Sequence, residues 1–169
     1  GCFVHERHAR NRELPRFAGW WGNDPAERFR MHLLDEFVPH GVAEGWQLSN
    51  PSIFAMAPLI ASLEIFDSVG ISALRAKSIE LTGYLESLVE AIDGCEILTP
   101  RNAAERGAQL SIRIPSASED VRAQLETAGC VCDSRPPDVI RVAPVPLYNR
   151  FHDCFTFARE LERIVKQRR

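Results

Sequence analysis

The first fifty-odd residues carry no periodic apolar pattern, and this limits most strongly what the chain can fold into. Residues 5–16 are polar and basic, whereas residues 17–23 and 41–51 are rich in glycine and aromatic side chains. Neither a helical nor a strand period fits them, so we expect loops, preceded by a short buried strand at residues 2–4. Such a stretch has nothing of its own to pack into a core. We therefore expect it to pack on something outside this chain or on another subunit.

Regular periods begin near residue 58. Leu59, Leu63 and Phe66 recur at helical spacing, and Gly70 is a good helix stop. A second long helix has an apolar face that precedes Gly94 and consists of Leu74, Leu81, Leu85, Leu88 and Ile92. We expect the two helices to form a pair in which these side chains serve packing only.

After Gly94 the pattern changes to short strands and helices. The sequence predicts strands at residues 95–99, 109–114, 131–133 and 139–142. One helix is expected to begin with Ser116 or Ser118 as N-cap and to end near residue 128, and a last helix to begin at Asn149. The chain is thus predicted to be of the α/β class, with a small α+β domain at residues 58–169 after a loop-rich segment at residues 1–57.

Charge and cysteine content narrow the class of protein. A net charge of -3 disfavours binding to nucleic acid or to an anionic membrane, and no apolar stretch reaches the ~20 residues that cross a bilayer. Five scattered cysteines do not suggest a disulfide framework, and Cys130-x-Cys132 near His152 lacks the usual zinc spacing. We expect reduced thiols, no metal site and a cytoplasmic protein without signal peptide. The chain lacks an initiator Met and opens as if within a strand, which suggests a fragment.

Two adjacent tryptophans, Trp20 and Trp21, lie in a predicted loop between Gly19 and Gly22. Such a pair is unfavourable in a loop unless each indole is buried or stacked, and an indole N–H can donate to a phosphate or carboxylate. The segment is either a plug in a core or a wall for a flat ligand, and the sequence leaves both interpretations open.

Ser49 and Asn50 follow Trp46 and precede the first long helix. Both residue types are natural helix caps. A polar pair at a helix N-terminus is also a good place for an anionic group, so a binding role stays open beside the capping role.

Arg141 lies inside an otherwise apolar strand, ahead of a Pro144-Val145-Pro146 turn. A buried guanidinium needs a partner, and no acidic residue has an obvious claim on this one. It could bind a carboxylate ligand through two hydrogen bonds. The alternatives are an arginine that faces the surface or one that forms an internal ion pair.

Taken in order, four segments resemble the kynureninase family. They are residues 15–22 (PRFAGWWG), Arg28-Phe29-x-Met31, residues 45–51 (GWQLSNP) and residues 141–149 (RVAPVPLYN). Supporting segments lie at residues 61–66, 81–85, 99–101 and 106–111. The resemblance extends from Gly1 to the last helix, and its motifs are long and correctly ordered.

The resemblance implies the C-terminal part of a fold-type I enzyme that uses pyridoxal 5'-phosphate. Residues 1–57 would end the large cofactor-binding domain. Such enzymes are homodimers with shared active sites, and they hydrolyse kynurenine or 3-hydroxykynurenine to alanine and anthranilate or its 3-hydroxy form, in tryptophan catabolism and NAD biosynthesis. By motif, Trp20 and Asn50 would contact the cofactor and Arg141 the substrate α-carboxylate. Trp21 and Ser49 would line the aromatic pocket.

Two departures limit this interpretation. The lysine that forms the Schiff base lies upstream in the family, and neither Lys77 nor Lys166 stands in its motif, so we expect no catalytic residue in this chain and no activity from it alone. The family usually has histidine where this chain has Asn23, which does not titrate.

Two other classes remain as alternatives. The chain could be a non-catalytic binding or interaction remnant of such an enzyme. It could also derive from another fold-type I lyase, such as a cysteine desulfurase-like enzyme, although a small aliphatic substrate needs no aromatic walls like Trp20 and Trp21.

Overall fold

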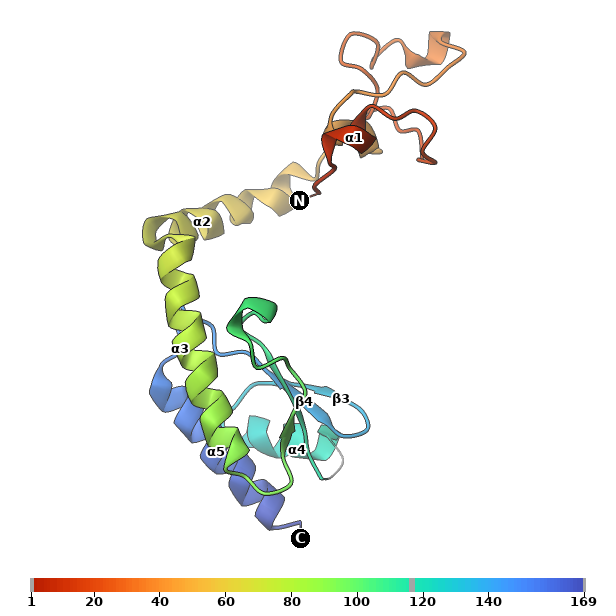
Figure 1. Cartoon of the computed structure of the whole chain (residues 1–169). Coiled ribbons are helices and arrows are strands. Elements are labelled where there is room, and N and C mark those ends of the chain that lie inside the picture. The colour runs from red at the N-terminus through yellow and green to blue at the C-terminus, as the bar shows by residue number, and fades with distance from the viewer. Residues whose placement is uncertain (1, 116–117, 169) are drawn as a thin grey trace. The chain divides into compact units, whose positions relative to one another are not determined.

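The computed structural model describes residues 2–115 and 118–168. It contains two compact units, Gly1–Leu63 and Glu64–Arg169, which divide inside helix α2 (Ile53–Val69) (Figure 1). The division falls close to the predicted boundary after residue 57. The assignment of the first segment to a larger cofactor-binding domain stays a prediction.

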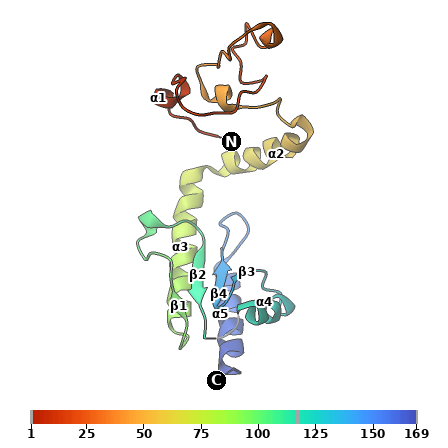
Figure 2. The same cartoon turned by 90° about the vertical axis from the view of Figure 1, so that its right-hand side faces the viewer.

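The second unit is built around a four-stranded antiparallel sheet (Figure 2). Its strands follow the spatial order β1-β2-β4-β3, with bounds Glu96–Ile97, Leu110–Arg113, Val139–Val142 and Asp133–Arg135. Ile112 on β2 lies opposite Ile140 on β4, and both side chains are fully buried. Because side chains alternate along a strand, Ser111 and Arg141 form the next pair and belong to the opposite face.

Three helices pack over the buried face of the sheet: α3 (Ile71–Glu90), α4 (Ser118–Thr127) and α5 (Phe151–Lys166). One apolar cluster joins the sheet to all three helices. Its fully buried members include Leu81 and Leu85 on α3, Leu125 on α4 and Leu161 on α5. Burial of a leucine side chain contributes roughly 1.5–3 kcal/mol, so this cluster is the main source of the unit's stability. The predicted packing role of Leu81 and Leu85 is confirmed.

The predicted strands agree with the sheet to different degrees. The strand at residues 139–142 is confirmed, and those at 109–114 and 95–99 are present in shorter form as β2 and β1. The strand predicted at residues 131–133 is displaced, because the pairing with β4 begins only at Asp133. The displacement places Asp133 directly opposite Arg141.

The start of α5 differs by one residue from the predicted N-cap Asn149. The N-cap of α5 is Arg150, whose backbone N–H donates to the Asp153 carboxylate at 2.9 Å. Asn149 instead accepts a hydrogen bond from the backbone N–H of Val145 at 2.8 Å. For α4 the sequence offered Ser116 or Ser118 as N-cap. Ser116 lies outside the described residues, and Ser118 is the first residue of the helix.

Helix α2 exists as predicted, but its packing differs. None of its seventeen residues is buried, and Leu59, Leu63 and Phe66 are all exposed. The helix is apolar on nearly all sides, which is typical of a helix covered by other protein in a larger core. The predicted packed pair with the following helix is therefore wrong. Among the described residues, no single helix is long and apolar enough to cross a membrane. Helices α2 and α3 taken together are long and apolar enough, but they meet at an 80° bend.

The first unit has little regular structure, as expected. Before α2, whose first part belongs to this unit, its described elements are α1 (Glu6–Ala9) and the 3-10 turns η1 (Met31–Leu33) and η2 (Ala43–Trp46). The strand predicted at residues 2–4 is absent, and Phe3 is exposed, because nothing in this unit pairs with that segment. The buried residues described before α2 are Ala9, Gly22, Asn23 and Gly45, too few and too small to form an apolar core.

Candidate functional site

The tryptophan loop closes in a tight turn in which the Gly22 N–H donates to the Gly19 carbonyl at 3.1 Å. The rings of Trp20 and Trp21 are perpendicular, with centroids 5.1 Å apart. Phe29 lies 5.8 Å from Trp20 and extends the aromatic cluster. Both indoles are only half-buried. The loop therefore leaves part of its aromatic surface exposed in this unit.

Trp20, Ser49 and Asn50 are joined by hydrogen bonds although they lie far apart in sequence. Trp20 Nε1 donates to Ser49 Oγ at 3.3 Å, and Ser49 Oγ donates to Asn50 Oδ1 at 3.1 Å. Ser49 and Asn50 do not cap α2, because that helix begins only at Ile53. The capping interpretation is wrong. The structure brings four predicted site residues together in one loop cluster, namely Trp20, Trp21, Ser49 and Asn50.

Glycine makes this close approach possible. A Cβ built on Gly19 would collide with the Cα and carbonyl of Leu48, and one on Gly22 would lie 2.8 Å from the carbonyl oxygen of Gln47. The tryptophan loop and the segment before Ser49 are thus in contact backbone to backbone. Sequence reasoning treated these glycines as loop formers and missed this contact.

Asn23 holds the tryptophan loop from inside. It is only 4% exposed, and its side-chain amide donates to the carbonyls of Gly19 at 3.0 Å and Trp20 at 3.4 Å. An amide suits this position because it donates at every pH. In this structure, Asn23 fixes the backbone that carries Trp20.

Two arginines stack on tryptophans of the same unit. The Arg28 guanidinium lies 4.3 Å from the centroid of Trp21, and that of Arg16 lies 4.2 Å from the centroid of Trp46. Cation–π contacts of this kind hold positive charge beside an aromatic surface. Sequence reasoning gave neither arginine a role, although each belongs to a segment that also carries aromatic residues.

Several hydrogen-bond donors of the first unit are buried without an acceptor. Among the described residues, Arg16 Nη1, Arg28 Nε and Trp46 Nε1 have no hydrogen-bond partner. Unsatisfied buried donors are rare and point to an acceptor that comes from elsewhere. These unpaired donors, together with the charge of Arg28, suit an anionic group such as a phosphate.

Arg141 lies in the second unit, on the sheet face opposite the core, and its side chain is 30% exposed. Its Nε donates to Asp133 Oδ2 at 3.0 Å, and its Nη2 donates to the same oxygen. Arg141 beside Asp133 lowers the pKa of that carboxyl group, so Asp133 stays ionised. The expectation that no acid has a claim on Arg141 is therefore wrong, because β3 begins where Asp133 faces it.

The turn after Arg141 is anchored at two points. Lys77 on α3 donates to the Pro146 carbonyl at 2.6 Å, and Asn149 accepts from the Val145 N–H. Pro144 is buried, which fixes the start of the turn. Lys77, an ordinary helix lysine by sequence, thus connects α3 to the end of the strand that carries Arg141.

Removal of the Lys77 ammonium group is expected to loosen this turn. In Lys77→Met the apolar stem remains while the hydrogen bond is lost, which costs about 1 kcal/mol at a partly exposed site. Amide exchange of residues 145–149, followed by mass spectrometry, should become about fivefold faster. Lys166→Met is the matched control, because Lys166 pairs with Glu162 near the end of α5. Unchanged exchange in Lys77→Met would show that the hydrogen bond does not hold the turn.

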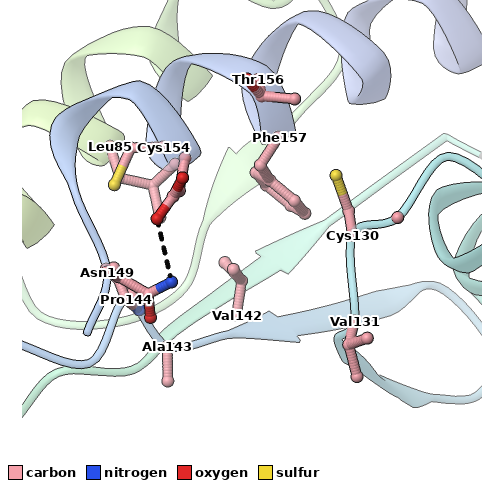
Figure 3. Close-up of a pocket in the computed structure, with 12 residues that line it drawn as sticks. Leu85, Cys130, Val131, Val142, Ala143, Pro144, Asn149, Cys154, Thr156 and Phe157 are labelled. Carbon is pink, nitrogen blue, oxygen red and sulfur yellow. Dashed lines mark hydrogen bonds between the residues drawn. The ribbon is translucent and has the colours of Figure 1, made fainter.

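A separate pocket lies on the core side of β4 (Figure 3). Its walls include Leu85, Val142, Pro144 and Phe157, with the thiols of Cys130 and Cys154. Burial raises the pKa of the Cys154 thiol to about 11, so it is a weak nucleophile at neutral pH. Arg141 does not line this pocket, because its side chain belongs to the face of β4 opposite that of Val142.

Solved structures with a similar fold include cysteine desulfurases and the lyase C-DES, whose structure holds a pyridoxal-phosphate cofactor. A cysteine desulfurase from Thermococcus onnurineus superposes with a TM-score of 0.70 at 18% identity, over 90% of this chain and 39% of its own. The cysteine desulfurase CsdA of Escherichia coli gives 0.69 at 14% identity over the same shares. At such identities the likeness concerns the fold alone. The fold is that of the C-terminal part of a fold-type I pyridoxal-phosphate enzyme.

Sequence relatives narrow the class further. The family described as "Kynureninase C-terminal domain" matches residues 74–161, just over half of the chain. Curated kynureninases from Koribacter versatilis and Xanthomonas euvesicatoria are 57% and 54% identical to it, over 93% and 96% of its length. The chain belongs to the kynureninase family. It spans 37–39% of the length of these relatives.

Proposed function

We propose that the intact protein hydrolyses kynurenine or 3-hydroxykynurenine to alanine and anthranilate or its 3-hydroxy form. The observation that carries this proposal is the identity of 53–57% with kynureninases of three bacterial genera over 93–96% of the chain. Cysteine desulfurases resemble the chain only in fold. The reaction would serve tryptophan catabolism and NAD biosynthesis in the cytoplasm, a compartment that suits the five free thiols.

In this proposal pyridoxal phosphate binds in part through the aromatic cluster of the first unit. The unsatisfied donors and the Arg28 charge support a phosphate group there, with Trp20 and Asn50 as cofactor contacts. When bound, the cofactor would supply an electron sink for cleavage of the Cβ–Cγ bond. Trp21 and Ser49 would line the aromatic pocket, and Arg141 would hold the substrate α-carboxylate.

The chain alone would lack activity in this proposal. Lys77 and Lys166 are engaged on helices of the second unit, with Pro146 and Glu162 respectively, and the Schiff-base lysine would come from upstream. The exposed apolar surface of α2 and the sparse core of the first unit support burial against further protein. We infer a homodimer in which both subunits complete each active site.

The test uses the purified intact protein with added pyridoxal phosphate and kynurenine. Visible absorbance that persists after dialysis reports bound cofactor, and fluorescence of released anthranilate reports the reaction. We expect both signals. Bound cofactor without anthranilate would reject kynurenine as substrate, and absence of both would leave a non-catalytic remnant as the better interpretation.

Trp20→Ala is expected to weaken retention of the cofactor. Loss of the indole removes an aromatic face and breaks the hydrogen bond that orients Ser49 and, through it, Asn50, which costs about tenfold in cofactor affinity. Phe17→Ala is the control, because Phe17 precedes the same loop but is 83% exposed. Retention of absorbance after dialysis in Trp20→Ala equal to that of the control would argue against a cofactor contact.

A further inference from the structure

The guanidinium group of Arg141 is held along one edge only. Its Nε and Nη2 both donate to a single oxygen of Asp133, Oδ2. Among the described residues, Nη1 has no hydrogen-bond partner. The Nη1 end of the group thus stays available to a ligand, while the other edge is fixed against rotation.

Asp133 is in turn held in place by its neighbours. It lies opposite Arg141 in the β3–β4 pairing, so the backbone sets the distance between the two side chains. Its second oxygen, Oδ1, accepts from Arg135 Nη1 at 2.8 Å, and the same Nη1 donates to the Ser134 carbonyl at 2.8 Å. The acidic group therefore has a defined orientation and serves as a fixed support for Arg141.

The charges of this triad favour an incoming carboxylate. Arg141 and Asp133 alone would form a neutral pair, and the Asp133 charge would repel a second carboxylate nearby. Arg135 adds a positive charge on the far side of Asp133, and the triad keeps a net charge of about +1. An arginine that is already oriented also loses less conformational entropy when it binds.

We propose that Asp133, supported by Arg135, is a positioning residue that presents the Nη1 end of Arg141 to the substrate α-carboxylate. The inference rests on the proposed function and deepens it. In this arrangement Asp133 does not touch the substrate. Its loss leaves Arg141 charged but free to rotate, so recognition of the carboxylate suffers while the chemical step does not.

The experiment compares Asp133→Ala and Asp133→Asn in the intact enzyme with pyridoxal phosphate bound. With kynurenine, we expect Asp133→Ala to raise KM about tenfold with kcat changed less than about twofold. Asp133→Asn keeps an acceptor oxygen and should show a smaller rise. Competitive binding of the decarboxylated analogue of kynurenine, which lacks the α-carboxylate, should be the same in both variants as in the parent.

Two controls separate positioning from a general structural effect. Asp138→Asn removes a carboxylate from the turn between β3 and β4, where Asp138 Oδ2 lies 3.5 Å from Arg113 Nε, and should leave KM unchanged. In an Arg141→Ala background, Asp133→Ala should add no further rise in KM, because there is no guanidinium left to orient.

The outcomes distinguish this inference from the proposed function. If Arg141→Ala raises KM while Asp133→Ala leaves it unchanged, the positioning role is rejected and the function stands. A lower KM in Asp133→Ala would mean that Asp133 competes with the substrate carboxylate for Arg141. That result would also reject the positioning role. Equal loss of affinity for the decarboxylated analogue would indicate a structural defect only. An intact enzyme that acts on neither kynurenine nor 3-hydroxykynurenine removes both proposals.

Discussion

Replacement of Arg141 by alanine in the intact protein is expected to weaken kynurenine binding by about 2–4 kcal/mol, or roughly 30-fold to 1,000-fold in KM. A charged contact made through the guanidinium would be lost, and nothing else in the described sheet could replace it. Arg135 is already bound to Asp133, and Arg113 is paired with Glu96 at 2.7 Å. Steady-state kinetics with kynurenine would measure the change.

A matched variant tests whether the effect belongs to the site. Arg113→Ala removes an arginine from the same face of the sheet, one strand away, and we expect kinetic constants close to those of the parent. Arg141→Lys keeps the charge but loses the planar fork, so an intermediate KM is expected. Unchanged KM and kcat in Arg141→Ala would remove this residue from the site.

The second unit could be predicted from sequence because its elements are local and its core lies within the chain. The sequence patterns at residues 109–114 and 139–142 predict β2 and β4, and the buried pair Ile112 and Ile140 lies on the core face of these strands. The packing role of Leu81 and Leu85 on α3 could be predicted for the same reason, whereas Leu88 is only half-buried. Their partners on the sheet and on α5 belong to the same hundred residues.

The wrong predictions concern segments whose structure depends on contacts outside the second unit. Residues 2–4 read as a strand, but a strand needs a neighbour to pair with, and the first unit offers none. Helix α2 was recognised by its period. Period alone does not reveal what covers a helix that is apolar on nearly all sides.

The sequence allowed us to name candidate site residues, but not the contacts that these residues make. Trp20, Ser49 and Asn50 were named separately, but the hydrogen bonds between them connect loops 29 positions apart, which no local pattern encodes. The partner of Arg141 was missed for a simpler reason. A strand placed at residues 131–133 puts Asp133 at its end, whereas the observed strand begins there and pairs Asp133 with Arg141.

Gly19→Ala is the loop variant for which we expect the largest effect. The added methyl group would collide with the backbone of Leu48, which cannot rotate away as a side chain could. Overpacking of this kind costs about 3 kcal/mol, and relief requires the two loops to separate. Separation would break the hydrogen bond from Trp20 to Ser49 and disturb the backbone that Asn23 holds.

The expected result in the intact protein is loss of cofactor on dialysis together with a changed near-ultraviolet circular dichroism signal from the tryptophans. Gly41→Ala is the matched control in the same unit, because its Cβ would lie 3.6 Å from Arg10 Cγ, an ordinary contact. Cofactor retained by Gly41→Ala but not by Gly19→Ala would tie binding to the contact between the loops. If Gly19→Ala also retains the cofactor and the tryptophan signal, the loops can separate without consequence, and the cluster of Trp20, Ser49 and Asn50 is not what holds the cofactor.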